Sequence, residues 1–147
     1  MESGKWRYGC LFPPSLRKRL ICFVDCFEGS RLFTLREHLE CINCLRVCCD
    51  KFASGSVDTR VCVWNWKTGA LLNVLEEHQG EIFCVTFVND NLLITGGGDD
   101  LIKVWTLVGS RCILTLHSQP EVVGCLQFDR NCLISGQGWL PMLLSFF

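Results

Sequence analysis

Short runs of alternating apolar and polar residues, separated by polar turns, dominate this chain. From Leu20 onward the runs are rich in β-branched, aromatic and cysteine residues, and Gly, Asn and Asp lie between them. Alternation with a period of two places successive side chains on opposite faces of a strand, so these runs predict β-strands. Because no segment keeps its apolar residues at helical spacing, we expect antiparallel sheet throughout and no helix.

The predicted strands recur in a fixed order. Three times, a strand, a turn and a second strand precede a histidine. The first strands are 20–24, 61–64 and 102–105, the turns are 29–30, 68–69 and 109–110, and the second strands are 31–35, 71–75 and 112–116. The histidines that follow are His38, His78 and His117. After each histidine comes a strand centred on Cys44, Cys84 or Cys125, then a polar turn, then a strand ending in Ser54, Thr95 or Ser135, each followed by Gly. Each full period therefore contains four predicted strands.

A polar signature accompanies this order twice. Downstream of the first histidine the chain has Ser54, Asp58 and Trp64, and downstream of the second it has Thr95, Asp99 and Trp105. A period of about 40 residues that carries His, Ser/Thr-Gly, Asp and Trp is the spacing of a β-propeller blade.

From about residue 20 to residue 138, this pattern resembles the WD-repeat β-propeller family. The resemblance implies an all-β fold, a partial propeller of four-stranded antiparallel blades with too few blades to close. It divides the chain into the following segments: a non-repeat leader (1–19), a repeat segment (20–138) with full repeats at about 37–76 and 77–116 and a partial third at 117–138, and a non-repeat hydrophobic tail (139–147). The family's Trp-Asp pair is incomplete here, since Val24-Asp25, Trp64-Asn65 and Trp105-Thr106 occupy its place.

The resemblance also gives the polar signature a structural role. Indole only donates, carboxylate only accepts, and hydroxyl and neutral imidazole do both, so Trp, Ser/Thr, His and Asp form a satisfied chain of hydrogen bonds. We therefore expect two locks within the blades, formed by His38, Ser54, Asp58 and Trp64 and by His78, Thr95, Asp99 and Trp105. The third repeat has His117 and Ser135, but Trp139 stands where Asp is due and no Trp follows. We expect that blade to lack the lock.

The same residue types suggest catalysis and metal binding, and the sequence favours neither. A catalytic serine needs an exposed hydroxyl and an oxyanion site, whereas these hydroxyls lie in strands and recur in every period, so we expect no enzyme activity. The segment with His38, Cys41, Cys44, Cys48 and Cys49 has zinc-like spacing. Cys41 and Cys44, however, would point to opposite faces of a strand. We expect no metal site and no cofactor.

The amino-acid composition argues against several classes of function. A net charge of −1, 49% hydrophobic and 20% charged residues indicate a globular protein and argue against nucleic-acid or membrane partners. No apolar run approaches the roughly 18 residues of a membrane span. The 12 cysteines lie largely within predicted strands, where reduced thiols pack as small apolar groups. We expect cytoplasmic localisation, nuclear localisation, or both.

Propellers bind partners on faces formed by their loops. By the resemblance, we expect protein contacts at Glu40, Val57, Thr59, Gln79, Glu81 and Asp100. The segment 125–129 is similar to repeats of the F-box/WD subgroup, the substrate receptors of ubiquitin ligases. The sequence thus predicts a non-catalytic interaction scaffold, part of such a receptor's substrate-binding propeller, with protein partners that include ligase components. The alternatives are a cysteine-dependent zinc-binding or redox protein, and a truncated product without independent function. We also expect the isolated chain to be marginally stable or to associate.

Overall fold

The computed structural model describes residues 19–24, 31–118, 122–129, 132–137 and 140–145. These residues form β-strands, turns and loops without a helix. The predicted all-β fold class is therefore confirmed. Among the described residues there is consequently no helix with the length and apolar character that crossing a membrane requires.

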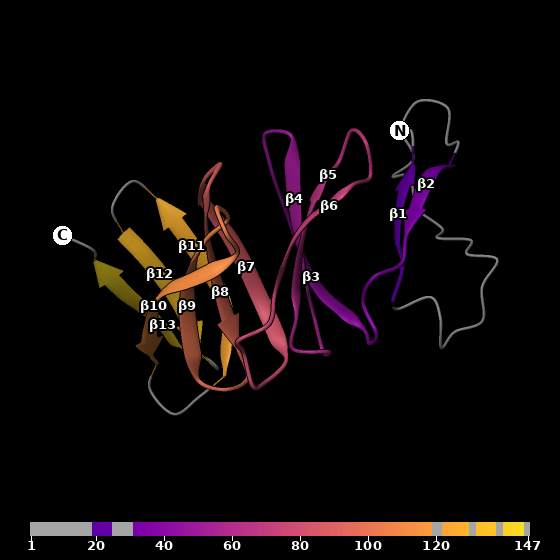
Figure 1. Ribbon diagram of the computed structural model, residues 1–147. Helices are drawn as coiled ribbons and strands as arrows, with labels where there is room; N and C mark the ends of the chain where they lie inside the picture. Colours follow the sequence, from indigo (N-terminus) through magenta and orange to yellow (C-terminus); the bar gives the residue numbers. More distant parts are fainter. Residues whose placement is uncertain (1–18, 25–30, 119–121, 130–131, 138–139, 146–147) are drawn as a thin grey trace, which may run out of the picture.

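Within the described residues, thirteen strands form three large sheets and a hairpin (Figure 1). The hairpin pairs β1 (Ile21–Val24) with β2 (Arg31–Leu35). The first sheet contains β3 (Ile42–Cys48), β4 (Lys51–Ser56), β5 (Val61–Asn65) and β6 (Leu71–Leu75). The second contains β7 (Ile82–Asn89), β8 (Leu92–Gly97), β9 (Leu101–Thr106) and β10 (Arg111–His117). The third contains β11 (Val123–Asp129), β12 (Cys132–Gln137) and β13 (Leu140–Ser145).

Each sheet is an antiparallel meander with the same internal irregularity. The register between the first two strands shifts after Ile42 in the first sheet, after Ile82 in the second and after Val123 in the third. The skipped residue is the one directly after each of these β-branched residues. A bulge at the same point in all three sheets shows that they are copies of one structural unit.

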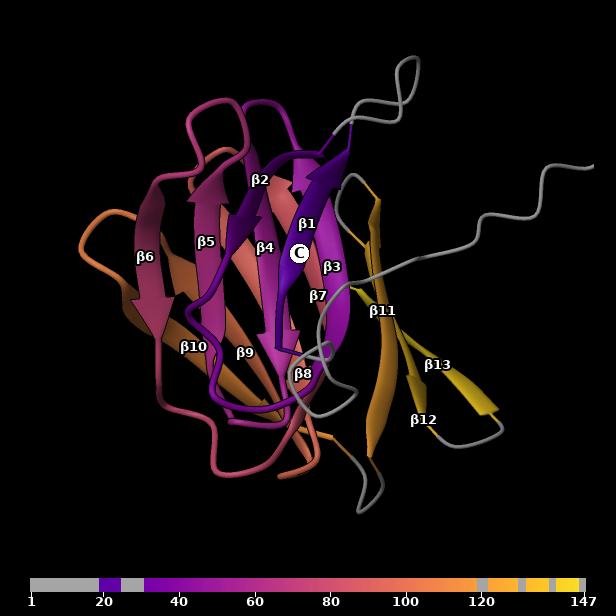
Figure 2. The same ribbon diagram turned by 90° about the vertical axis from the view of Figure 1, so that its right-hand side faces the viewer.

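The first strands of the three sheets lie next to one another, with β7 between β3 and β11. The sheets are therefore stacked side by side around these strands and cover an arc without closing it (Figure 1). The hairpin β1–β2 lies against the outer face of the first sheet (Figure 2). There Ile21 and Leu35 pack with Phe52, Cys62 and Trp64.

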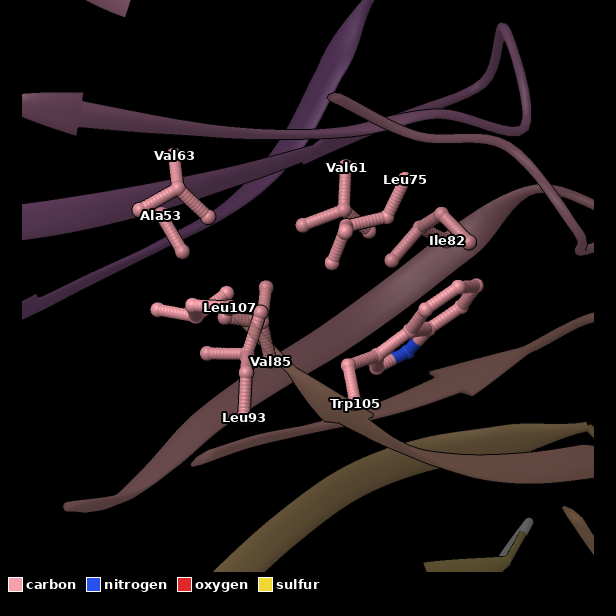
Figure 3. Close-up of a cluster of buried hydrophobic side chains, with 9 residues drawn as sticks. All are labelled: Ala53, Val61, Val63, Leu75, Ile82, Val85, Leu93, Trp105 and Leu107. Atoms are coloured by element: carbon pink, nitrogen blue, oxygen red, sulfur yellow. The ribbon is translucent and has the colours of Figure 1, made fainter. Parts of the chain in front are cut away.

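Successive side chains of a strand point to opposite faces of its sheet, so each strand contributes to the packing against two neighbouring layers. Val61 and Val63 of β5 face the second sheet, while Cys62 and Trp64 face the hairpin. The cluster between the first and second sheets is fully apolar apart from one indole N–H (Figure 3) and consists of Ala53, Val61, Val63, Leu75, Ile82, Val85, Leu93, Trp105 and Leu107. The next interface repeats this arrangement with Cys84, Ile94, Ile102, Val123, Leu126 and Leu133.

Two glycines allow neighbouring sheets to approach closely. A Cβ atom on Gly55 would lie 2.5 Å from Ile82 Cγ2, and one on Gly96 would lie 2.6 Å from Val123 Cγ1. Both glycines occupy the same position, after the hydroxyl residue of the second strand. The Ser/Thr-Gly pair of the sequence pattern therefore combines a hydrogen-bonding side chain with a packing position that accepts no side chain.

The tail contains a strand that the sequence pattern did not predict. β13 pairs antiparallel with β12 in unbroken register from Cys132↔Ser145 to Gln137↔Leu140. It thereby occupies the third-strand position of its sheet, as β5 and β9 do in theirs. Pro141 is compatible with this position because β13 is an edge strand, where a missing N–H costs least. Trp139 and residues 1–18 lie outside the described residues.

Candidate functional site

The polar signature residues lie at one end of the first and second sheets. His38 belongs to the loop between β2 and β3, and Asp58 to the turn between β4 and β5. His78 and Asp99 occupy the equivalent loop and turn of the second sheet. We call this end, with its two loops (36–41 and 76–81) and two turns (57–60 and 98–100), the loop face.

In the first sheet the four residues form a continuous chain of hydrogen bonds. Nδ1 of His38 lies 3.0 Å from Asp58 Oδ2, and Nε2 lies 2.7 Å from Ser54 Oγ. The Trp64 indole donates to the same hydroxyl oxygen at 3.1 Å. His38 and Ser54 are buried, so water does not compete for these groups.

The donor and acceptor roles determine the tautomer of His38. A carboxylate only accepts hydrogen bonds, so Nδ1 carries the proton and donates a hydrogen bond to Asp58. Nε2 then accepts from Ser54, and the Ser54 oxygen accepts from Trp64. Each polar atom in this chain has a complementary partner when the imidazole is neutral, which is the condition for a stabilising buried network.

The second sheet repeats this geometry closely. Nδ1 of His78 lies 2.9 Å from Asp99 Oδ2, and Nε2 lies 2.7 Å from Thr95 Oγ1. The Trp105 indole donates to Thr95 Oγ1 at 2.8 Å. Threonine replaces serine without changing the pattern because both supply one hydroxyl at the same position.

The two carboxylates also hold the backbone of the loop face. Asp58 accepts from the backbone N–H of Leu39 at 2.8 Å and of Arg60 at 3.1 Å. Burial alone would raise the pKa of Asp58, but these donors and His38 outweigh it and lower the pKa. Asp99 has the equivalent contacts with Gln79 and Leu101, and its pKa is lowered for the same reasons.

We predict that the protein loses stability as the pH falls below about 6.5. Burial lowers the pKa of His78, although Asp99 opposes this shift. Between the folded pKa and the ordinary value of about 6.5, the unfolded chain binds a proton that the folded chain does not, so stability rises with pH there. The lowered pKa of Asp58 and Asp99 extends the loss below about pH 4. Urea unfolding between pH 3 and 8 measures the slope, and a His78→Gln variant should reduce it in the window just below about pH 6.5.

Among the residues that the structure describes, the third sheet has no equivalent hydrogen-bonded chain. Ser135 is buried at 1% exposure, and its hydroxyl has no hydrogen-bond partner among these residues. His117 is exposed on β10. In the register of β12 and β13, Leu144 pairs with Leu133, as Trp105 pairs with Leu93 in the second sheet. At this register position leucine stands where the other two sheets have tryptophan.

Substitution of the two serines by alanine should therefore have opposite consequences. We expect Ser54→Ala to reduce the free energy of unfolding by about 1–3 kcal/mol, because it leaves His38 Nε2 and the Trp64 indole without a partner. Ser135→Ala should be neutral or stabilising, because it removes a buried hydroxyl that has no partner among the described residues. Urea unfolding of both variants tests this, and an equal loss in both would contradict the assignment of roles.

The loop face carries all six residues that the sequence suggested as protein contacts. Glu40, Gln79 and Glu81 are exposed, whereas Val57, Thr59 and Asp100 are half-buried. Backbone hydrogen bonds tie loop to turn in each sheet: Val57 donates to the Cys41 carbonyl at 2.9 Å and Gly98 to the Glu81 carbonyl at 2.8 Å. Thr59 and Asp100 adopt left-handed backbone conformations, with φ of 67° and 60°, that close their turns tightly.

The structure does not assemble the zinc-like set of the sequence. Both ring nitrogens of His38 are engaged by Asp58 and Ser54. Burial raises the pKa of Cys44 to about 12, which keeps its thiol protonated. At the opposite end of the sheets, Cys48 and Cys49 lie beside Asp90 instead. Sequence reasoning missed this grouping because Asp90 belongs to the turn of a different repeat.

The sequence of this chain matches a protein-family model and several known proteins. Residues 29–65 and 69–106 match the family model described as WD domain, G-beta repeat. The WD repeat-containing protein pop1 of Schizosaccharomyces pombe is 32% identical over 78 residues, which are 53% of this chain and 10% of pop1. The nuclear distribution protein nudF of Aspergillus flavus is 30% identical over 111 residues, which are 70% of this chain and 24% of nudF. The chain thus spans a small part of the length of these relatives.

Solved structures share the fold. The computationally designed Ika4 protein superposes with a TM-score of 0.80 at 27% identity, covering 88% of this chain and 81% of Ika4. The WD40 repeats of RRP9 superpose with a TM-score of 0.76 at 18% identity, covering 82% of this chain and 39% of that one. Because the family model matches about half of the residues and the sheets have the same arrangement as these repeats, the chain belongs to the WD-repeat family.

Proposed function

We propose that this chain is a non-catalytic protein-interaction module that binds a partner through the loop face. WD-repeat proteins are typically interaction scaffolds, and the chain belongs to that family. The observation that carries the proposal is the double fixation of each loop on that face. A buried carboxylate holds the loop backbone through Leu39 or Gln79, and a backbone hydrogen bond joins the loop to the adjacent turn.

This fixation favours binding because the contact residues are ordered before a partner arrives. A flexible loop loses conformational entropy when it binds, whereas a preorganised loop has already lost it in folding. The hydroxyls of Ser54 and Thr95, by contrast, are fully buried at 0% exposure and already donate to histidine. A substrate cannot reach them, which supports a non-catalytic role.

The charge of the loop face suggests the chemistry of the partner. Three of the six contact residues (Glu40, Glu81 and Asp100) are acidic and none is basic. Arg19 pairs with Glu40 at 3.3 Å, so Glu81 and Asp100 are the carboxylates best placed to meet a partner. A protein segment bearing Lys or Arg fits this surface through complementary charge, which contributes to specificity and to the association rate.

Affinity purification with charge-reversed variants tests the proposal. The full chain is compared with a Gln79→Lys, Glu81→Lys variant of the loop face and with an Asp50→Lys, Asn91→Lys variant of the opposite end, after circular dichroism has shown equal folding. We expect a set of proteins that both wild type and the opposite-end variant retain and the loop-face variant loses. Equal retention by all three chains, or loss only in the opposite-end variant, would reject the loop face as the binding surface.

Two narrower proposals rest on the sequence. The similarity of 125–129 to F-box/WD repeats supports a role as part of a ubiquitin-ligase substrate receptor, with ligase components among the partners. Reduced cysteines within the strands support cytoplasmic or nuclear localisation, since an oxidising compartment favours disulfides. Ligase subunits among the loop-face-dependent proteins would support the first, and fluorescence microscopy of the tagged chain tests the second.

A further inference from the structure

We propose that Cys48, Cys49 and Asp90 form a zinc site that joins the first and second blades at the end opposite the loop face. Cys48 is the last residue of β3, Cys49 lies in the turn between β3 and β4, and Asp90 lies in the turn between β7 and β8. Their ligand atoms all lie within 4.8 Å of one another. Two sulfurs and one carboxylate oxygen are ligands that Zn²⁺ accepts, and thiolates disfavour Mg²⁺ and Ca²⁺.

The distances match the edges of a zinc coordination tetrahedron. With Zn–S bonds of about 2.3 Å and Zn–O bonds of about 2.0–2.2 Å, two sulfurs on one tetrahedral zinc ion are about 3.8 Å apart, and a sulfur and an oxygen are about 3.6 Å apart. Cys48 Sγ lies 3.9 Å from Cys49 Sγ and 3.8 Å from Asp90 Oδ1. Two of the three distances between ligand atoms therefore match zinc coordination, and the third, between Cys49 Sγ and the Asp90 carboxylate, is no longer than 4.8 Å.

The fold brings the three ligands together in a way that a regular strand does not allow. Adjacent residues on a strand point to opposite faces, but Cys49 has a left-handed backbone with φ of 50°. The Trp66 indole donates to the Cys49 carbonyl at 2.7 Å, and the Lys51 ammonium donates to the Asp90 carbonyl at 2.7 Å. The first bond holds the Cys49 turn within the first blade, and the second crosses the junction between the two blades.

Core packing does not explain these two cysteines. Cys62 and Cys84 are buried among apolar residues, whereas Cys49 is exposed and Cys48 is half-buried. In the second blade, Asn89 stands at the position of Cys48, and its side-chain oxygen accepts hydrogen bonds from the backbone N–H groups of Asn91 and Leu92. The exposed side of Cys49 leaves a fourth coordination position open to water, and Lys51 partly offsets the negative charge of the three ligands.

Metal titration of the reduced full-length chain tests the site. Zn²⁺ is measured by competition with a chromophoric chelator, and Co²⁺ is used as a spectroscopic probe of sulfur ligation. We expect one equivalent of metal, sulfur-to-cobalt charge-transfer bands, and a melting temperature raised by about 5–10 °C at a hundredfold excess of Zn²⁺ over Kd. The absence of zinc binding, or cobalt spectra without sulfur bands, would overturn the proposal.

Matched variants separate this site from the remaining cysteines. Asp90→Asn and Cys49→Ser should each reduce zinc affinity at least tenfold and abolish most of the rise in melting temperature. Asp50→Asn is the control for the first, because Asp50 is an exposed turn carboxylate that pairs with Lys67. Cys112→Ser is the control for the second, because Cys112 is a half-buried thiol on β10 outside the cluster. Equal affinity in all four variants would assign the zinc to other thiols and overturn the proposal.

Discussion

Trp105→Ala is expected to lower the free energy of unfolding by about 3–5 kcal/mol. Trp105 is 1% exposed and lies in the core between the first and second blades, where its ring faces Ile82 (Figure 3). The substitution leaves a cavity at that interface and removes the donor to Thr95 Oγ1. Urea unfolding followed by circular dichroism gives the loss.

Two further variants distinguish packing from hydrogen bonding. Trp105→Phe keeps an aromatic ring but no N–H, so it should recover a substantial part of the loss. Trp66→Ala is the control, because Trp66 is 38% exposed and lies outside the core clusters. We expect it to cost less than about 1 kcal/mol. A loss in Trp66→Ala as large as that in Trp105→Ala would contradict the importance of the interface between the blades.

Asp58→Ala is expected to lower the free energy of unfolding by about 2–4 kcal/mol, because it leaves the buried His38 imidazole and two backbone N–H groups without their acceptor. The side chain of Asp58 is 4% exposed and accepts from His38, Leu39 and Arg60. Its loss therefore affects the imidazole and the backbone of the loop face together. Thermal and urea unfolding measure the effect, and hydrogen exchange at Leu39 and Arg60 should accelerate.

A carboxylate in the same blade provides the control for Asp58. Asp50 pairs with Lys67 at 2.6 Å, but both side chains are more than half exposed. Exposed ion pairs contribute about 0–1 kcal/mol, so Asp50→Ala should change stability by less than that. Similar losses in Asp50→Ala and Asp58→Ala would show that the loss reflects charge removal in general, and the proposed role of Asp58 would be rejected.

The sequence pattern predicts only part of the difference between the two locked blades and the third blade. The absence of an Asp and a Trp at the expected positions of the third repeat predicted a blade without the lock, and Ser135 has no hydrogen-bond partner in the part of the chain that the structure describes. The strand β13 was not anticipated, because Leu140–Ser145 carries no turn or charge signature. Backbone pairing requires only an extended segment beside an open edge, and the edge of β12 supplied it.

Local sequence determined the strands, their order and the residues of the two locks. Alternation with period two is a property of neighbouring residues, and the spacing of His, Ser/Thr, Asp and Trp follows from strand and turn lengths within a single blade. Bulges after Ile42, Ile82 and Val123 and the close contacts of Gly55 and Gly96 depend on neighbouring strands and sheets. Only the tertiary structure decided these features.

The same distinction separates the loop face from the proposed zinc site. Asp58 and His38 belong to one repeat, so the repeat pattern of the sequence was enough to predict that they lie close together. Cys48 and Cys49 belong to one repeat and Asp90 to the next, and they meet because β3 packs beside β7. A contact within a blade is determined by a period that the sequence displays. A contact between blades depends on how the sheets stack, which is decided by the packing of side chains from both blades.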